Sequence, residues 1–192
     1  MSGMNTSGQP ALIVIDLQQA IDDPRWSAEG PRNNPQAEAN IARLLAAWRG
    51  AGRPFFHIRH DSTEPQSTYR PGQAGNRFKA EAEPRPGEPV VAKTVNSAFV
   101  GTDLDARLKA AGATELVVCG VITNNSVEAT VRNGANLGWA IRLVEDACFT
   151  YAKRDYAGTP RSAQEVHDMS LANLDGEYCQ VVRTADVLDQ LG

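Results

Sequence analysis

Three side chains that could take part in chemistry follow short apolar runs of the sequence. Asp16 ends the run ALIVID, Lys93 ends EPVVAK, and Ser126 lies shortly after ELVVCGV. A carboxylate can transfer protons, and an activated hydroxyl or thiol can attack a carbonyl carbon. An acid, a lysine and a hydroxyl group at three strand ends can converge on one point. Together they are candidates for a nucleophilic active site.

Each of these residues also has an ordinary structural explanation. Asp16 could cap the turn after its strand, and Lys93 could be a solvated charge at a strand end. Ser126 could be a polar residue at the start of a helix, because Asn125 and Glu128 have the three-residue offset of a capping box. Taken singly, the structural explanations are favoured. Taken together, the three residues favour a site.

Six apolar runs supply the strands that must position these side chains. They are short, rich in β-branched or aromatic residues, and continuous rather than alternating, which is typical of strands covered on both faces. The predicted strands are residues 11–16, 54–60, 88–93, 115–121, 140–146 and 179–184.

Helical patterns alternate with the predicted strands. Their apolar stripes begin at Ile41, Leu104, Val127, Val166 and Val187. The alternation predicts a three-layer, doubly wound α/β fold, with a mainly parallel six-stranded sheet and helices on both faces. We expect one domain over residues 10–192, preceded by a loose tail over residues 1–9.

Ligands of doubly wound sheets bind beyond the carboxyl ends of the strands. This rule selects Asp16, His60 with Asp61, Lys93, and residues 121–126. The connection over residues 61–87 is long and rich in proline, glycine and charge. Long connections of this kind are often functional, so we expect this one to help build a pocket or a subunit contact.

Several motifs resemble those of one known superfamily. IDLQ, KTVNSAFVGTDL, GVITNNSVEATVRNGANLGW, VEDAC and SAQEVHDMSLANL occur in the order found in the isochorismatase-like cysteine hydrolases. That superfamily includes nicotinamidase, N-carbamoylsarcosine amidohydrolase and streptothricin hydrolase. The resemblance covers nearly the whole chain after the tail. It implies the isochorismatase-like fold and an Asp–Lys–Cys catalytic triad.

The resemblance assigns a role to each candidate. It implies that Asp16 is the general base and acid, and that Lys93 holds the nucleophile and orients the acid. The motif G-x-x-T-x-x-C-V places the cysteine at position 126, where this chain has Ser126. The resemblance further implies an oxyanion hole formed by the backbone N–H groups of Ile122 and Ser126. It also implies a cis peptide bond between Val121 and Ile122.

Serine at position 126 changes the expected chemistry. A cysteine beside a lysine at a helix N-terminus readily becomes a thiolate, whereas a serine hydroxyl is far harder to ionise and has no histidine base in this arrangement. We therefore expect the Ser126 form to be inactive or strongly weakened. The serine could be an engineered replacement of cysteine or a natural change. The flanking residues keep the pattern of active members, which favours engineering.

The predicted function is hydrolysis of a C–N bond in a small amide, ureide or related substrate through a thioester intermediate. One alternative is hydrolysis of an isochorismate-like vinyl ether, which needs the fold and the acid but no cysteine. Another alternative is a noncatalytic ligand-binding relative.

Loops around the predicted triad supply candidate substrate contacts. We predict that these are Gln18, Trp26, His60, Tyr69, Asn96, Phe99 and Asn125. His57 and His60 have His-x-x-His spacing, but on a strand their side chains point to opposite faces. We therefore predict no catalytic metal and no cofactor, and a structural role for His57.

Composition limits the class of partner. The chain has 192 residues and a formal net charge of −4, which argues against nucleic acid or an anionic membrane surface. Its apolar runs are far shorter than the ~20 residues that span a bilayer. Cys119, Cys148 and Cys179 show no paired or zinc-like spacing, and the first ten residues resemble no signal peptide. We expect a cytoplasmic protein and, by analogy with the family, a homodimer or homotetramer.

Overall fold

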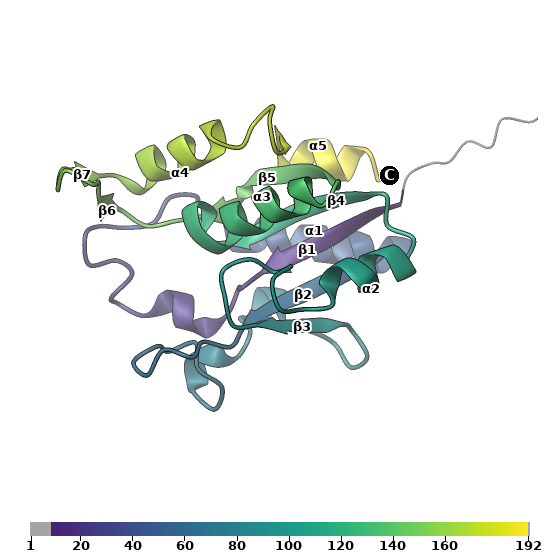
Figure 1. Cartoon of the computed structure of the whole chain (residues 1–192), viewed down its shortest axis with the longest axis horizontal. Helices are drawn as coiled ribbons and strands as arrows, with labels where there is room; N and C mark the ends of the chain where they lie inside the picture. The colour runs from purple at the N-terminus through teal and green to yellow at the C-terminus, as the bar shows by residue number, and fades with distance from the viewer. Residues whose placement is uncertain (1–8, 192) are drawn as a thin grey trace, which may run out of the picture.

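Six parallel strands form the central sheet of the computed structural model, which describes residues 9–191 (Figure 1). In the spatial order β3-β2-β1-β4-β5-β8, they are Val90–Lys93, Phe55–His60, Pro10–Ile15, Glu115–Val121, Ala140–Phe149 and Gln180–Val182. Every neighbouring pair in this sheet is parallel. The predicted doubly wound α/β fold is confirmed.

Helices cover both faces of the sheet. Helices α1 (Ala37–Ala51) and α5 (Thr184–Asp189) lie on one face, and α2 (Leu104–Ala110) and α3 (Glu128–Asn136) lie on the other (Figure 1). Helix α4 (Ala163–Ala172) packs against the turn that follows β4. No helix within residues 9–191 has the length and apolar character needed to cross a lipid bilayer.

The continuous apolar runs are explained by burial. All six residues of β1 are buried, because the strand lies in the middle of the sheet with helices above and below it. On α1 the predicted stripe from Ile41 to Trp48 faces this sheet and is fully buried. The indole N–H of Trp48 donates to the carbonyl oxygen of Pro10 at 3.0 Å, which satisfies its polar atom inside the core.

The strand order reverses between β1 and β4. Strands β2 and β3 lie on one side of β1, whereas β4, β5 and β8 lie on the other. Chain segments that leave β1 and β4 at their carboxyl ends therefore diverge to opposite faces, and a crevice forms between them. Asp16 and residues 121–126 follow these two strands.

The long connection over residues 61–87 is folded onto the carboxyl ends of β1 and β2. It contains the short 3₁₀ helices η2 (Ala74–Asn76) and η3 (Ala80–Ala82). The Asn76 side-chain amide donates to the carbonyl oxygens of His60 at 3.1 Å and Tyr69 at 2.7 Å. The segment is thereby tied to the edge of the sheet where ligands are expected.

Three details differ from the sequence-based expectation. Strand β5 runs to Phe149, three residues beyond the predicted end at 146. Two short strands, β6 (Lys153–Arg154) and β7 (Pro160–Arg161), form a separate antiparallel hairpin. The predicted tail lies outside the described residues except for Gln9, whose carbonyl oxygen accepts a hydrogen bond from the Thr114 N–H at 3.1 Å.

Candidate active site

The three predicted catalytic side chains meet around the ammonium group of Lys93. Its Nζ donates to Asp16 Oδ2 at 2.6 Å and to Ser126 Oγ at 3.3 Å. A third bond, of 3.2 Å, goes to the carbonyl oxygen of Val95. Asp16, Lys93 and Ser126 are 3%, 2% and 8% exposed, so this cluster is almost closed to solvent. An acid, a cation and a potential nucleophile are therefore in direct contact.

Strand β1 and the glycine opposite its end position Asp16. Asp16 has a left-handed backbone with φ of 51°, and its N–H donates to the Ile58 carbonyl oxygen at 3.0 Å. Gly120 on β4 pairs with Ile15, the preceding residue. A Cβ at Gly120 would collide with the Ile15 backbone, and the φ of +123° there also requires glycine. Glycine thus lets β4 come close to the strand that ends in Asp16.

Lys93 reaches Asp16 across an intervening strand. Its strand, β3, pairs with β2, so His60 is the register partner of Lys93. Neighbouring strands lie about 4.8 Å apart, so β3 and β1 are about 10 Å apart. The long lysine side chain and the Asp16 side chain bridge this gap together, and Nζ also lies 3.4 Å from His60 Nδ1. A shorter cation at position 93 would not reach the acid.

The turn after β4 carries Ser126. The Val121–Ile122 peptide bond is cis, as the resemblance implied. A single π-helical turn, η4 (Thr123–Val127), then continues directly into α3. Backbone N–H groups of Asn125 and Val127 both donate to the Ile122 carbonyl oxygen, at 3.1 and 3.4 Å. Because the turn folds back on Ile122, the backbones of residues 122 and 126 belong to one compact unit.

The capping box considered for this turn is wrong. The N-cap of α3 is Val127, which makes no side-chain capping bond within the described chain. Asn125 lies inside the preceding turn, so its side chain is not at the helix end. The Glu128 carboxylate instead accepts bonds from Ser170 Oγ at 2.7 Å and from Arg132 Nη2 at 2.9 Å.

Burial dominates the electrostatics of the site. It raises the pKa of the Asp16 carboxyl, although the charge and hydrogen bond of Lys93 oppose the rise. Burial, followed by the nearby Lys93 ammonium, lowers the pKa of His60. Asp16 Oδ1 is buried and makes no hydrogen bond within residues 9–191. One carboxylate oxygen is thus held by lysine, and the other is available to a ligand.

Aromatic residues form a wall near η4 (Thr123–Val127), which we name the nucleophile turn after the predicted role of residue 126. Trp26 and Tyr151 stack with ring centroids 6.3 Å apart and an interplanar angle of 26°. Trp26 Nε1 and the Tyr151 hydroxyl donate to the carbonyl oxygens of Ala20 and Ile21, at 3.0 and 2.8 Å. These bonds turn the polar ends of both rings toward η1 (Gln19–Asp22). The two rings are therefore fixed in place.

A cavity of about 420 Å³ lies beside this aromatic wall. It is lined by Trp26, Tyr151, Ile122 and Asn125, among other residues, so it borders the turn that carries Ser126. Tyr69 packs edge-on against both Trp26 and His60, with centroid separations of 6.5 and 5.7 Å. Four of the predicted substrate contacts, Trp26, His60, Tyr69 and Asn125, therefore lie around the cluster. Asn96 is exposed in the loop after β3.

Two other predicted substrate contacts, Gln18 and Phe99, have partners within the fold. Gln18 is fully buried, and its amide bonds to the His60 N–H at 2.7 Å and to the carbonyl oxygens of His60 and Asn76 at 3.1 and 2.8 Å. It joins the end of β2 to the long connection. Phe99 lies against α3, where its ring would contact a Cβ on Gly134. Both side chains thus have partners within the fold, and their contact with a substrate stays a prediction.

The three histidines lie at three separate places. His57 Nε2 bonds to the Glu88 carboxylate at 3.1 Å, as expected for a structural residue. His60 lies beside Lys93, and His167 Nδ1 bonds to Thr123 Oγ1 at 2.8 Å. Within residues 9–191, no group of three or more histidine, cysteine or acidic side chains is arranged to hold a metal ion.

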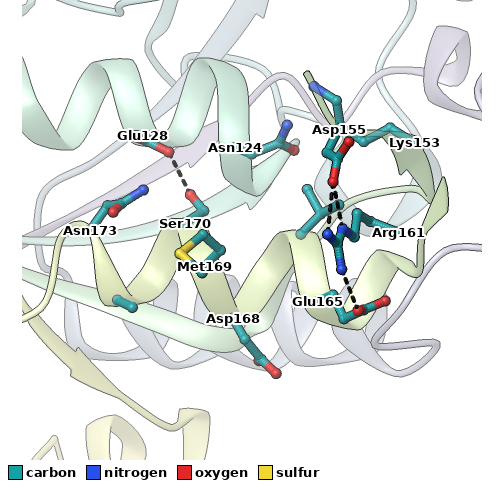
Figure 2. A pocket seen from close by; sticks show the side chains of 12 residues that line it. Asn124, Glu128, Lys153, Asp155, Arg161, Glu165, Asp168, Met169, Ser170 and Asn173 are labelled. Atoms are coloured by element: carbon teal, nitrogen blue, oxygen red, sulfur yellow. Dashed lines mark hydrogen bonds and ion pairs between the residues drawn. The ribbon is translucent and has the colours of Figure 1, made fainter. Parts of the chain in front are cut away.

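A larger cavity, of about 820 Å³, is lined by none of Asp16, Lys93 and Ser126 (Figure 2). It is formed by α4, the β6–β7 hairpin and the start of α3. Arg161 pairs there with Asp155 and Glu165, and Ser170 bonds to Glu128 (Figure 2). These five polar side chains therefore have partners within the lining of the cavity.

Sequence reasoning missed Tyr151 in the aromatic wall. The search for residues that follow the carboxyl ends of strands overlooked it, because β5 was predicted to end at residue 146. Strand β5 instead runs to Phe149 and places Tyr151 at the edge of the sheet. It also missed His167, whose partner Thr123 lies 44 residues away along the chain. No local pattern connects these two residues.

Comparison with known proteins finds similar sequences and structures. The model of the Isochorismatase domain matches residues 10–186. A crystal structure of an isochorismatase-family protein from Chromobacterium violaceum has a TM-score of 0.93 and 63% identity, covering 97% of this chain and 95% of that one. Streptothricin hydrolase from Streptomyces noursei is 38% identical over 144 residues, 73% of this chain and 50% of the relative. Ureidoacrylate amidohydrolase RutB from Variovorax paradoxus is 31% identical over 174 residues, 71% of this chain and 67% of the relative.

Proposed function

The chain belongs to the isochorismatase family of hydrolases, and on that premise we propose that its site hydrolyses a C–N bond in a small amide, ureide or related substrate. One observation carries the proposal: Lys93 Nζ bonds to both Asp16 and Ser126 inside a closed cluster. A relative named as an amidohydrolase supports the choice of bond.

Asp16 is suited to move protons in this reaction. Its Oδ2 is held by Lys93, while its buried Oδ1 makes no hydrogen bond within the described chain. Burial also raises the pKa of the carboxyl, which makes the carboxylate a stronger base toward the proton of the nucleophile. The free oxygen can take a proton from the nucleophile and return it to the leaving nitrogen.

The proposed reaction proceeds in two steps when residue 126 is cysteine. The sulfur attacks the carbonyl carbon, Asp16 takes the thiol proton, and the oxyanion is held by the N–H groups of Ile122 and residue 126. The C–N bond then breaks as Asp16 protonates the amine, leaving a thioester. Water attacks the thioester, gives a proton to Asp16, and the thiol is restored by that proton as the acid product leaves.

A serine at position 126 slows the first step of this reaction, the attack on the carbonyl carbon. The Ser126 hydroxyl contacts Lys93 Nζ, and the described chain provides no histidine hydrogen bond to it. A serine hydroxyl is intrinsically far less acidic than a cysteine thiol, so a lysine partner that would favour a thiolate does not ionise the hydroxyl. We therefore propose that the Ser126 form is inactive or slow, and that a thiol at this position restores activity. Comparing the chain with its genomic coding sequence decides whether Ser126 is native.

One specific observation favours a second candidate reaction. The site has a buried acid with a free oxygen, yet it lacks the thiol. Hydrolysis of an isochorismate-like vinyl ether needs such an acid to protonate the double bond, but needs no covalent nucleophile. In that case the Ser126 protein would be the active form.

A paired assay tests the two candidates. The parent, Ser126→Cys and Ser126→Ala are incubated with a panel of small amides and ureides and, separately, with isochorismate. We expect Ser126→Cys to release ammonia or amine and to show an acyl adduct by intact mass, while Ser126→Ala shows neither. If Ser126→Cys hydrolyses no amide while the parent cleaves the vinyl ether of isochorismate, the second reaction is established instead.

A further inference from the structure

Helix α4 holds the first residue of the nucleophile turn with two side chains. His167 Nδ1 lies 2.8 Å from Thr123 Oγ1. One helical turn further on, the single hydroxyl hydrogen of Ser170 is shared between Glu128 Oε2 at 2.7 Å and the Thr123 carbonyl oxygen at 3.4 Å. Figure 2 shows the Ser170 and Glu128 side chains facing one another between α4 and α3. The turn is thus attached at its start and just beyond its end.

These contacts are buried, so breaking them would be costly. Thr123 and His167 are 0% and 1% exposed, and Ser170 is also buried. Buried polar atoms are nearly always paired, and breaking one pair leaves the other partner without compensation. The hydrogen bond to His167 therefore favours one placement of Thr123 over its alternatives.

The placement of Thr123 affects both groups that the reaction needs. Thr123 directly follows Ile122 and precedes Ser126 by three residues. The Ile122 carbonyl oxygen in turn accepts the N–H groups of Asn125 and Val127, on either side of Ser126. A shift of Thr123 away from α4 would move the Ile122 N–H and the side chain of residue 126 relative to Lys93.

We propose that His167 is a positioning residue, which acts through Thr123 to hold residue 126 and the Ile122 N–H in register with Lys93. This inference rests on the proposed function, because it takes residue 126 as the nucleophile. Within residues 9–191, the His167 side chain bonds to Thr123 and makes no hydrogen bond with Asp16, Lys93 or Ser126. It therefore affects the reactivity of residue 126 and does not bind the substrate directly.

A thiol reporter tests the positioning without any amide substrate. In the Ser126→Cys background, the rate at which iodoacetamide alkylates the introduced thiol is followed by peptide mass spectrometry from pH 5 to pH 10. The three native cysteines give little background, because Cys119 and Cys148 are fully buried and burial raises the pKa of Cys179 to about 12. The parent chain, with Ser126, measures whatever background remains.

Four variants are compared in that background. His167→Phe and Thr123→Val each remove the hydrogen bond, while His167→Asn keeps a polar atom where Nδ1 lies. His57→Phe is the matched control, since it removes another fully buried histidine with one hydrogen bond, on β2. Unfolding by denaturant is measured for each, so that loss of stability is separated from loss of reactivity.

The expected result is specific to the hydrogen bond. His167→Phe and Thr123→Val should slow alkylation by about fivefold or more and move its pH midpoint, whereas His167→Asn should stay within about twofold of the Ser126→Cys protein. His57→Phe should lower stability and leave alkylation unchanged. Should His167→Phe fail to fold, Thr123→Val and His167→Asn carry the same comparison.

The outcomes separate this inference from the proposed function. Equal rates and pH midpoints for the Ser126→Cys protein and for both bond-deleting variants would overturn the positioning role. An equal loss in His57→Phe would overturn it as well, because the effect would then follow stability. If alkylation responds as expected while no amide is hydrolysed, the positioning role stands and the amidase proposal fails.

Discussion

Gly120 lies opposite Ile15 on the neighbouring strand, with no room for a Cβ between the two backbones. This close approach brings the turn carrying Ser126 to the strand end carrying Asp16. The glycine also has a φ of +123°, a conformation that L side chains rarely adopt. Space and backbone conformation therefore require glycine at the same position.

Replacing this glycine should damage both stability and the site. We expect Gly120→Ala to lose more than about 2 kcal/mol of unfolding free energy, because the methyl group collides with backbone and φ is unfavourable. Denaturant unfolding measures the loss. Gly50→Ala is the matched control: Gly50 is in α1 with open space around it, so alanine should stabilise the helix by about 0.5–1 kcal/mol. A Gly120→Ala protein as stable as the parent would contradict this account of the strand contact.

The buried pair of Asp16 and Lys93 should be strongly coupled. Asp16→Asn leaves the Lys93 ammonium buried without a counter-charge, which should cost about 3–5 kcal/mol of stability. In the Ser126→Cys form it should also reduce hydrolysis by about 10²–10⁴-fold through loss of the proton carrier.

The double variant Asp16→Asn/Lys93→Met separates these two effects. It removes both charges, so stability should return toward the parent while activity stays lost. The free energies of unfolding of the two single variants and the double variant form a mutant cycle. Additive losses of stability would show that the two side chains are not coupled.

Gln18 should support the fold and not the substrate. Gln18→Ala removes the partner of the His60 N–H and of the Asn76 carbonyl oxygen, so we expect a loss of about 2–4 kcal/mol. The neighbouring Gln19 has an exposed side chain, and Gln19→Ala should change stability by less than about 0.5 kcal/mol. A Gln18→Ala protein with parental stability and a raised KM would instead return Gln18 to the substrate contacts.

Glu88 should make stability depend on acid pH. Its carboxylate bonds to Arg49 Nε and Nη2, both at 2.7 Å, and to His57, and the hydrogen bonds from Arg49 are the main cause that lowers its pKa to about 2. The pKa is lower in the folded chain than in the unfolded one. The stabilisation is therefore complete above about pH 4.5 and is lost as the pH falls toward 2.

The variant Glu88→Gln tests this dependence. It should be less stable than the parent by about 1–3 kcal/mol at pH 7, and the difference should shrink between pH 4.5 and 2. Unfolding free energies at several pH values measure the difference, with Glu64→Gln, at an exposed side chain, as the control. A difference between Glu88→Gln and the parent that is constant over this range would refute the assignment.

The sequence alone determined the architecture and the three central residues. Continuous apolar runs mark strands buried on both faces, and parallel strands all end at one edge of their sheet. A residue at the end of such a run, such as Asp16 or Lys93, can therefore be placed without knowing any contact. The motif around Ser126 added the position of the nucleophile turn.

Only the tertiary structure decided which loop side chains face that edge. Gln18 turned to backbone partners in the long connection, Phe99 packed on α3, and Tyr151 reached the site because β5 is longer than its apolar run. His167 met Thr123 from a different helix. Loop side chains are oriented by hydrogen bonds and packing between residues far apart in sequence. Such contacts leave no local periodicity, so they appear only once the chain is folded.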